Sequence, residues 1–383
     1  MDEGALPLDV VHEILLHLPA KPLCRFRAVC RPWRRLLSDP LFMAAHGARH
    51  PGPHLIASYI CNTEHDILLS IVDHSGQIIK QIRRKEEERV TLMASDLVCI
   101  TTLQDDTYRL LNPSTGAVYH MLDQLAQEHI DRGLELRDYS EPVHLFGLAA
   151  GKGEYKVLRM LIRFAWNGAH QYLFEVCTLN RNRGARWRAK QAPPMSSMWD
   201  KCARVVIDGV VYLLNVDVYN SFNSGLHVTE KDWIVSFDLE TEEWRPNIRG
   251  PSSLLVGAAA VDMLERLNGR AGSRHIALTN LNGSLVIVLA WSSCMDMWFL
   301  MDSEEGLWVK QYSMQVAPYK NHRLVRPLLV LDDGRIVVHI TNMRLLQIYD
   351  PRSNNFTDVV RLSHCWEVSM YTGNLLTLDG HNQ

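Results

Sequence analysis

The chain has 383 residues, of which 47% are hydrophobic and 22% charged, and its formal net charge at pH 7 is −3. This length allows two domains, or one large domain with an added module, and the composition excludes an intrinsically disordered chain. The nearly balanced charge gives no global field that would attract nucleic acid.

The cysteines and the apolar runs indicate neither secretion nor a membrane. Eight cysteines are scattered without a C-x-x-C pair, which predicts free, mostly buried thiols in a reducing compartment. The first residues are acidic and show no signal peptide. The longest apolar runs are far shorter than the ~18 residues that cross a bilayer. We therefore expect a cytoplasmic or nuclear protein.

Residues 6–46 have the period and the prolines of three short helices. Apolar residues recur in steps of four, at Val10 and Ile14 and again at Val11 and Leu15, which places them on helix faces. Proline suits a first helical turn and ends the helix before it. The expected helix starts are Pro7, Pro22 and Pro32.

Three short helices cannot close a large core by themselves. Domains below roughly 40 residues usually need a metal, a disulfide or a partner. The segment carries no metal or disulfide signal, so a partner is expected.

The same segment resembles the F-box. The resemblance rests on many co-spaced residues, namely Leu6-Pro7, Glu13-Ile14-Leu15, Leu18-Pro19, Leu23, Phe26-Arg27, Val29-Cys30, Trp33 and Ser38-Asp39-Pro40. Leu8 departs from the pattern, because plant F-boxes often carry an acidic residue there. The resemblance implies docking onto a Skp-type adaptor, which in turn joins a cullin-based ubiquitin ligase. An ordinary helical cap packed on the body of the protein is the alternative.

The resemblance also implies which residues contact the adaptor, although some of them must instead hold the helices together. The ten candidates are Leu6, Pro7, Ile14, Leu15, Leu18, Pro19, Leu23, Val29, Cys30 and Trp33. Six cations and no acid lie between residues 20 and 35, at Lys21, Arg25, Arg27, Arg31, Arg34 and Arg35. We interpret them as a patch that steers an acidic partner. The alternatives are a solvated helix face and, less favoured, a nuclear-import or RNA-binding patch.

A change of pattern follows the helices. Residues 47–54, GARHPGPH, hold two prolines and two glycines, which predicts a linker. The expected domains are therefore 1–46, a linker at 47–53, and a β-domain at 54–383. In this β-domain a strand, a polar turn and an anchored second strand occur six times. The six turns hold Asp73, Asn112, Thr178, Asp238, Asp302 and Asp350.

Tight hairpins precede several of these six units, at Asp208-Gly209, Asn282-Gly283 and Asp333-Gly334. Such pairs supply the positive φ angles that two-residue hairpin turns need. Two hairpins make a four-stranded antiparallel unit, and six units predict a β-propeller. Closure would place Ser369–Leu378 beside His54–Ile60. A β-sandwich or two stacked barrels is the alternative.

The β-domain also resembles the F-box-associated, kelch-related propeller of plant F-box proteins, loosely over residues 54–378. The matching stretches are NPSTG at 112–116, GEYKVLRM at 153–160, WIVSFDLETEEW at 233–244, DMWFL with GLWVK at 296–310, PLLVLDDGRIVV at 327–338 and YDPRSNNFTDV at 349–359. Departures are Asp96, where the family usually turns on glycine, and two stretches that fit no repeat, Asp123–Pro142 and Leu254–Ser273. The fold class is thus α+β and multidomain, with an N-terminal three-helix F-box and an all-β, six-bladed propeller.

Motifs for metal binding and catalysis are not found. His12 and His17 lie five residues apart, about 140° around a helix, and cannot share a metal. His46, His50 and His54 are spaced by four, but the prolines between them oppose a continuous helix. Gly151 and Gly153 indicate a hairpin turn rather than a phosphate loop. Neither a metal nor another cofactor is expected.

The aromatic residues divide into two groups. Trp187, Trp244, Trp308 and Phe356 occupy equivalent places in the repeat, which predicts anchors packed between blades rather than a binding cage. Trp166, Trp199 and Trp291 lie off that register, either in the core or on a binding rim.

The sequence therefore predicts a non-catalytic specificity subunit of a Skp/cullin/F-box ubiquitin ligase, which presents a target protein on its propeller. The alternatives are an adaptor-independent propeller that binds a peptide or a glycan and, least favoured, an enzyme. Neither nucleic acid nor a membrane is an expected partner. The target is expected on long loops, since loops carry function. The candidate loops are Asp123–Pro142, Asn215–Asp232 and Met314–Arg326.

Overall fold

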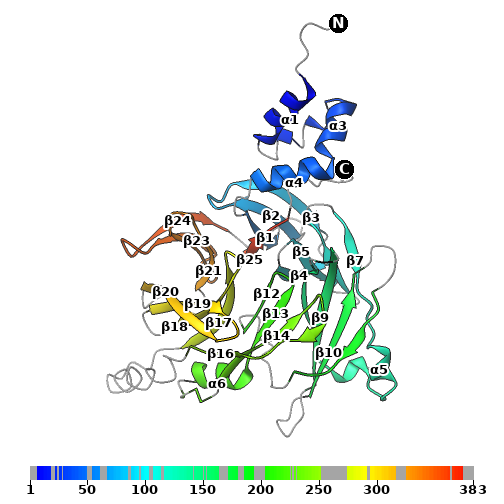
Figure 1. Ribbon diagram of the computed structural model, residues 1–383, viewed down its shortest axis with the longest axis vertical. Coiled ribbons are helices and arrows are strands. Elements are labelled where there is room, and N and C mark those ends of the chain that lie inside the picture. Colours follow the sequence, from blue (N-terminus) through cyan, green and yellow to red (C-terminus); the bar gives the residue numbers. More distant parts are fainter. Residues whose placement is uncertain are drawn as a thin grey trace. The chain divides into compact units, whose positions relative to one another are not determined.

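The computed structural model shows a few N-terminal helices followed by sheets (Figure 1). It describes residues 7–18, 22–23, 26–27, 29–49, 54–60, 67–84, 88–94, 96–102, 107–113, 116–140, 142–149, 151, 153–163, 171–179, 185–193, 203–224, 226, 228–229, 231–251, 274–290, 294–315, 325–362 and 365–373. The chain divides into two compact units, Met1–Tyr119 with His364–Gln383, and His120–Ser363. No helix in the described ranges is long and apolar enough to cross a membrane.

The helices are α1 (Leu8–Leu16), α3 (Arg31–Leu37) and α4 (Pro40–Arg49). Residues 22–23 and 26 are also helical. Pro7 precedes α1 and Pro32 lies in the first turn of α3, so the predicted starts of these two helices are confirmed. We refer to residues 7–49 as the helical module.

Helix α4 was not predicted, because Asp39-Pro40 indicated only a turn. The chain does turn there, and Pro40 then begins a helix whose Leu41 N–H donates to Asp39 Oδ1 at 2.7 Å. Capping of this kind satisfies one of the free N–H groups of a first helical turn. The helix runs into the segment 47–53 that was expected to be a linker.

All named strands belong to six antiparallel sheets, the six blades of the propeller. The first unit holds the sheet β25-β1-β2-β3 and the sheet β4-β5-β6-β7. Their bounds are β1 (His54–Ile60), β2 (Ile67–Asp73), β3 (Ile78–Arg84), β4 (Glu88–Ala94), β5 (Leu97–Thr102), β6 (Tyr108–Leu111), β7 (Val118–His120) and β25 (Cys365–Tyr371).

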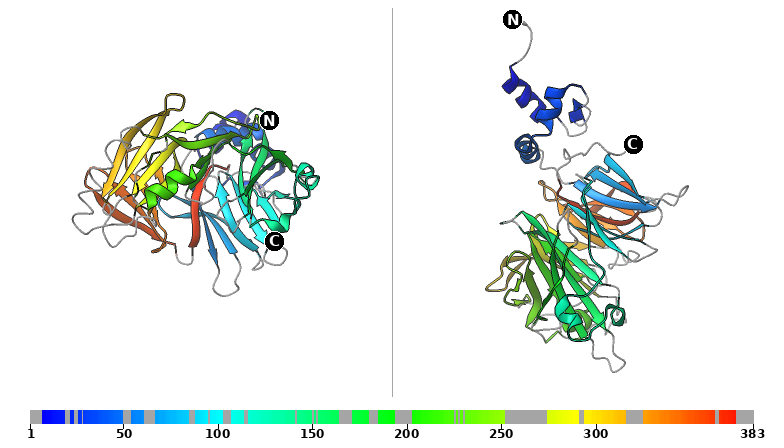
Figure 2. Two further views of the ribbon diagram at one scale, coloured as in Figure 1. Left: turned by 90° about the horizontal axis from the view of Figure 1, so that it is seen from below. Right: turned by 90° about the vertical axis from the view of Figure 1, so that its right-hand side faces the viewer.

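The second unit holds four further sheets, with strand orders β8-β9-β10-β11, β12-β13-β14-β15 with β16 beside β14, β17-β18-β19-β20, and β21-β22-β23-β24. Their bounds are β8 (Val143–Ala149), β9 (Glu154–Arg163), β10 (Gln171–Thr178), β11 (Arg188–Lys190), β12 (Arg204–Ile207), β13 (Val210–Leu214), β14 (Asp232–Asp238), β15 (Glu243–Trp244), β16 (Ile248–Arg249), β17 (His275–Leu281), β18 (Ser284–Ala290), β19 (Cys294–Asp302), β20 (Leu307–Gln315), β21 (Val325–Val330), β22 (Ile336–Ile340), β23 (Leu345–Asp350) and β24 (Asn355–Arg361). Figure 2 shows these sheets from two further sides.

The predicted closure of the first blade is confirmed. Strand β25, from the end of the chain, pairs antiparallel with β1, placing His54 opposite Tyr371 and Ile56 opposite Ser369. The pairing strand begins at Cys365, earlier than the expected Ser369. One sheet thus joins the first and the last described strands of the chain.

The six predicted repeats are the hairpins between the third and the fourth strand of each sheet. Aspartate has a physical reason to recur there, because its carboxylate can accept backbone N–H groups of the turn that follows. Asp73, Asp238, Asp302 and Asp350 each do so, accepting from a backbone N–H two residues on at 2.7–2.9 Å.

The tight hairpins also form where they were expected. Asp208 and Gly209 have φ of 47° and 75°, and Asn282 and Gly283 have 54° and 84°, as a two-residue turn of this hand requires. A Cβ on Gly209 would come within 2.7 Å of the Leu148 carbonyl oxygen, so only glycine fits. In the β21–β22 turn the φ of Gly334 is positive, at 85°. Asp333 is not one of the residues with a positive φ.

The predicted anchors form a repeated contact between successive parts of the second unit. The indole N–H groups of Trp187, Trp244 and Trp308 donate to the carbonyl oxygens of Leu122, Gln191 and Arg249, at 2.9, 2.8 and 2.7 Å. Each acceptor lies at or after the end of the sheet that precedes the tryptophan in the chain. Phe356, the equivalent residue of the last sheet, packs against Tyr349. Trp166, Trp199 and Trp291 lie outside the described residues.

Candidate functional site

The helical module has a small core of its own. Five apolar side chains are fully buried together, Leu15, Leu16, Leu23, Leu37 and Phe42. Half-buried residues such as Val11, Phe26 and Trp33 pack around them. Burying five side chains of this size contributes roughly 10 kcal/mol before the cost of ordering the chain. A module of this size is therefore close to the limit of independent stability.

Polar contacts tie the helices of the module to each other. Arg27 donates from Nε to the Leu37 carbonyl oxygen at 3.2 Å, in the last turn of α3, where a cation is favoured by the helix dipole. His46 Nε2 bonds the Leu18 carbonyl oxygen at 2.8 Å, and its ring stacks on Phe42. Arg27 and His46 therefore have structural roles in the module.

The outer surface of the module exposes more large apolar side chains than a small soluble module needs. Val10, Ile14, Val29 and Leu41 are 42%, 48%, 64% and 81% exposed. On α1 the residues Val10 and Ile14 lie four apart on one face, while Leu15 points into the core. The helix is thus apolar on two sides, and its own module covers only one of them.

The structure separates the ten sequence candidates by burial. Pro7, Ile14, Val29 and Cys30 are exposed. Leu18 and Trp33 are half-buried against the core, and Leu15 and Leu23 belong to the core itself. Leu6 and Pro19 lie outside the described residues. A partner can reach the exposed group directly, and the buried group can only support it.

Sequence reasoning did not include Val10 and Leu41 among the contact candidates. Val10 could have been found, because it precedes Ile14 by one helical step of four on the same face. Leu41 carried no such signal, since the helix that presents it was not predicted. Arg31, Arg34 and Arg35 of the basic patch are exposed, while Lys21 and Arg25 lie outside the described residues.

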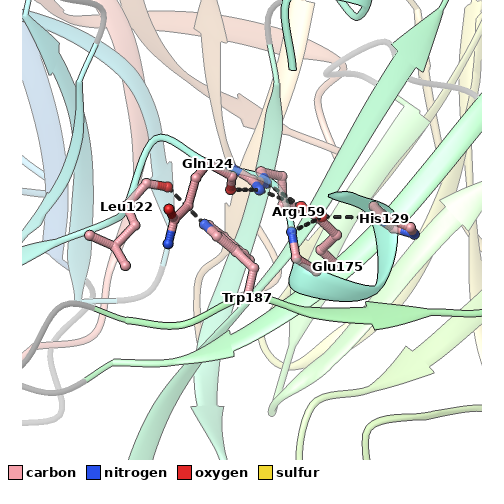
Figure 3. A network of polar contacts seen from close by, with 7 residues as sticks. Leu122, Gln124, His129, Arg159, Glu175 and Trp187 are labelled. Atoms are coloured by element: carbon pink, nitrogen blue, oxygen red, sulfur yellow. Dashed lines mark hydrogen bonds and ion pairs between the residues drawn. The ribbon is translucent and has the colours of Figure 1, made fainter. Parts of the chain in front are cut away.

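A second candidate region, the loop Asp123–Pro142, is anchored on a buried carboxylate (Figure 3). It carries α5 (Gln127–Ile130) and a short 3-10 helix, η1 (Leu136–Asp138). Glu175 of β10 accepts the Ala126 N–H at 2.7 Å and faces His129 Nδ1 at 2.9 Å through the same oxygen. A buried strand therefore holds the start of α5.

The other oxygen of Glu175 binds Arg159 of β9. The Nε and Nη2 atoms of Arg159 both donate to Glu175 Oε2, and Nη2 also donates to the Gln124 carbonyl oxygen at 2.6 Å. The guanidinium lies 4.0 Å from the centre of the Trp187 ring, a favourable cation–π arrangement. Both charges are fully engaged, as a buried ion pair requires if it is not to destabilise the fold.

His144 lies beside this network without carrying a charge at neutral pH. It is opposite Arg159 in the ladder of β8 and β9, and 6.0 Å from Trp187. Burial, together with the nearby positive charges of Arg159 and Arg204, lowers the pKa of His144 to about 3. The network is thus an anchor for the loop.

Two candidate loops remain, Asn215–Asp232 and Met314–Arg326, together with the cysteines. Asn215–Asp232 contains α6 (Val216–Asn223), which is capped by the Asn215 side chain and buries Val218 and Phe222. Met314–Arg326 lies mostly outside the described residues, as does Leu254–Ser273. The five described cysteines are free thiols, and burial raises the pKa of Cys177 to about 12. The described residues contain no cluster of potential metal ligands.

A small helical module followed by six antiparallel blades defines the class of protein. The chain matches the family model of the F-box domain over residues 5–44 and that of the F-box associated beta propeller domain over residues 61–363. It belongs to the plant F-box proteins that carry this propeller, as both resemblances in the sequence implied.

Several relatives in Arabidopsis thaliana span most of the chain. An F-box/kelch-repeat protein is 24% identical, covering 97% of this chain and 82% of the relative. An F-box/LRR-repeat protein is 23% identical, covering 89% and 76%, and an F-box protein is 23% identical, covering 93% and 87%. Among solved structures, a chain of the nidogen/laminin complex aligns over 83% of this chain and 98% of its own, at a TM-score of 0.39 and 10% identity.

Proposed function

We propose that this chain is the target-recognition subunit of a Skp/cullin/F-box ubiquitin ligase. The helical module docks on a Skp-type adaptor, which joins a cullin, and the propeller holds a target protein for ubiquitination. The chain makes and breaks no bond itself. Its contribution is proximity, because tethering raises the effective concentration of the target near the ubiquitin-loaded enzyme.

One observation carries the proposal, the exposure of Val10, Ile14, Val29 and Leu41 on a module whose described residues include five fully buried apolar side chains. Val10 and Ile14 share one face of α1, and exposed apolar faces of this kind mark protein-binding surfaces. The free thiols and the expected reducing compartment agree with a ligase that works in the cytoplasm or nucleus.

The exposed cations of α3 give the docking a second component. Arg31, Arg34 and Arg35 are exposed, and the described residues of the segment 20–35 include no acid. Such a patch accelerates association with an acidic partner at low ionic strength. We expect the association rate with the adaptor to fall as salt is raised, and the dissociation rate to change little.

The test is binding of the purified full chain to a purified Skp-type adaptor. Ile14→Asp places a charge on the exposed apolar face of α1 without touching the core, and we expect a loss of affinity of about 30-fold or more. Ala48→Asp is the matched control, because it adds the same charge at an exposed position at the end of α4. Unchanged adaptor binding by Ile14→Asp would refute the docking surface.

A further inference from the structure

The outermost strands of the six sheets differ in how well their free edges are protected. An edge strand presents unpaired N–H and C=O groups that can pair with another chain, and natural proteins prevent this with short strands or charged side chains. Three outer strands are short, β7 and β11 with 3 residues and β15 with 2. Two others carry charges, Lys80, Arg83 and Arg84 on β3, and Asp358 and Arg361 on β24.

Strand β20 is the least protected of the six, because it is long and its one charged side chain, 46% exposed, is held in an ion pair with the neighbouring strand. It is 9 residues long, and in the described sheets it is an end strand with a partner, β19, on one side only. Its single charged residue, Lys310, lies 3.3 Å from the Asp296 carboxylate of β19. Toward its end the Ser313 carbonyl oxygen accepts from the Tyr349 hydroxyl at 3.4 Å. The open part of the edge is therefore Leu307–Gln311.

Exposed apolar side chains lie along this open edge on one face of the strand. Leu307 and Val309 are two residues apart, on one side of the strand, and they are 54% and 42% exposed. Met301, at the end of β19, is 58% exposed, and its sulfur lies 3.8 Å from the Gln311 side-chain amide. The alternate residue, Trp308, is buried and bonded to the Arg249 carbonyl oxygen, which fixes which side of β20 faces outward.

The turn before β20 adds a charge of one sign. Asp302, Glu304 and Glu305 are exposed, and Asp302 closes the turn by accepting the Glu304 N–H at 2.8 Å. Arg249 lies next to Gly306, where a Cβ would come within 2.9 Å of the Arg249 Cβ, and the turn itself carries three acidic residues and no basic one. A chain that paired with β20 would bring its own end beside this acidic turn.

We propose that Leu307–Gln311 is a docking edge for an extended segment of the target protein, which adds to the sheet β17-β18-β19-β20 as a further strand. Only a strand can satisfy a row of free backbone groups, so a helix or a small ligand would not fit. The segment would carry apolar residues at alternate positions, against Leu307 and Val309, and a lysine or arginine beside Asp302, Glu304 and Glu305. This inference rests on the proposed function only in assigning the strand to a target.

The experiment is selection of peptides from a phage-displayed library of random dodecapeptides on the purified full chain. We expect enrichment of sequences with alternating apolar residues and a basic residue at one end. Selected peptides should bind the double variant Leu307→Lys, Val309→Lys at least 10-fold more weakly, because the two lysines protect the edge. Hydrogen exchange at residues 307–311 should slow when peptide binds.

Matched controls keep the result decisive. The double variant Asn355→Lys, Thr357→Lys places the same two charges at exposed positions of β24 and should leave peptide binding unchanged. Selection that yields no binding peptide, or peptides that bind the double variant equally well, overturns the proposal. Dimerisation of the wild-type chain that the double variant lacks would also overturn it, because the edge would then bind a second copy.

The two proposals fail separately. Loss of peptide binding in the Leu307→Lys, Val309→Lys variant should leave its affinity for the adaptor unchanged. Conversely, Ile14→Asp should lose the adaptor and keep the peptide. A chain that binds peptides on β20 but no adaptor would refute the proposed function alone.

Discussion

The helical module and the blades use apolar residues in opposite ways. Among the described residues of the module, five apolar side chains are fully buried and four large ones remain on the surface. In β22 all five residues, Ile336–Ile340, are buried, because strands of a blade lie between further strands and other sheets. The apolar residues that the module leaves uncovered are where we propose that its partner binds. A blade buries nearly all of its apolar residues, so only its loops and strand edges can indicate a binding site.

The largest expected effect comes from the anchor of the loop Asp123–Pro142, which tests how far blade stability depends on buried charge. Glu175→Gln removes the charge that balances Arg159 inside the protein, and we expect a loss of about 3–5 kcal/mol in the free energy of unfolding. The midpoint of chemical denaturation, followed by tryptophan fluorescence, measures it. Glu243→Gln, an exposed position, should change stability by no more than about 0.5 kcal/mol.

The double variant Arg159→Met, Glu175→Gln distinguishes the contribution of the ion pair to stability from that of the packing around it. Removing both charges leaves no uncompensated ion, so much of the lost stability should return. Stability that stays as low as in Glu175→Gln alone would mean that the hydrogen bonds to Ala126 and His129 matter more than the ion pair.

The next largest effect on stability is expected in the helical module. It tests the difference between the buried and the exposed adaptor-contact candidates. Leu15→Ala removes a core side chain and should cost about 2–4 kcal/mol, which is most of the stability that such a module can have. Ile14→Ala, one residue away and exposed, should cost little. Limited proteolysis of the full chain should cleave residues 7–49 quickly in the first variant only, with the blades intact in both.

Much of this architecture could be predicted because the signals are local. Asp73, Asp238, Asp302 and Asp350 mark their hairpins through side-chain bonds to the backbone a few residues on, and Asp208-Gly209 marks its turn through φ angles. Such determinants lie within a few consecutive residues, and a single sequence displays them.

Other features depend on residues far apart in the chain. The bond between Glu175 and the Ala126 N–H joins residues 49 positions apart, and no spacing in the sequence marks it. Helix α4 was missed because a proline indicates a helix start and a turn equally well. The division of Ile14 from Leu15 required the packed helices, since both positions fit an apolar face.

Acidification should weaken the blades through His144. Its pKa is lowered to about 3 in the fold by burial and by Arg159 and Arg204, against about 6.5 in an unfolded chain. Between these two pKa values His144 is protonated in the unfolded chain and neutral in the folded chain. The contribution of neutral His144 to the free energy of unfolding is fully present above pH 6.5 and is lost as the pH falls from 6.5 toward 3.

Between pH 7 and pH 5 this difference amounts to about 2 kcal/mol. Chemical denaturation at a series of pH values should show a steeper decline for the wild-type chain than for His144→Gln, whatever the absolute stability of the variant. Equal slopes would mean that His144 takes up its proton without unfolding. Glu175 and His129 lie in the same network and are unchanged in both proteins, so the comparison isolates His144.

The smallest expected effect concerns the tryptophan contacts between successive parts of the second unit. Trp308→Phe keeps an aromatic ring but loses the N–H that donates to the Arg249 carbonyl oxygen at 2.7 Å, and we expect a loss of about 1–2 kcal/mol. Trp187→Phe should cost more, because its ring also faces the Arg159 guanidinium. Phe356 holds the equivalent position of the last sheet with no such donor, so the bond adds to a packing contact that already exists. If both variants unfold at the wild-type denaturant midpoint, apolar packing alone holds these contacts.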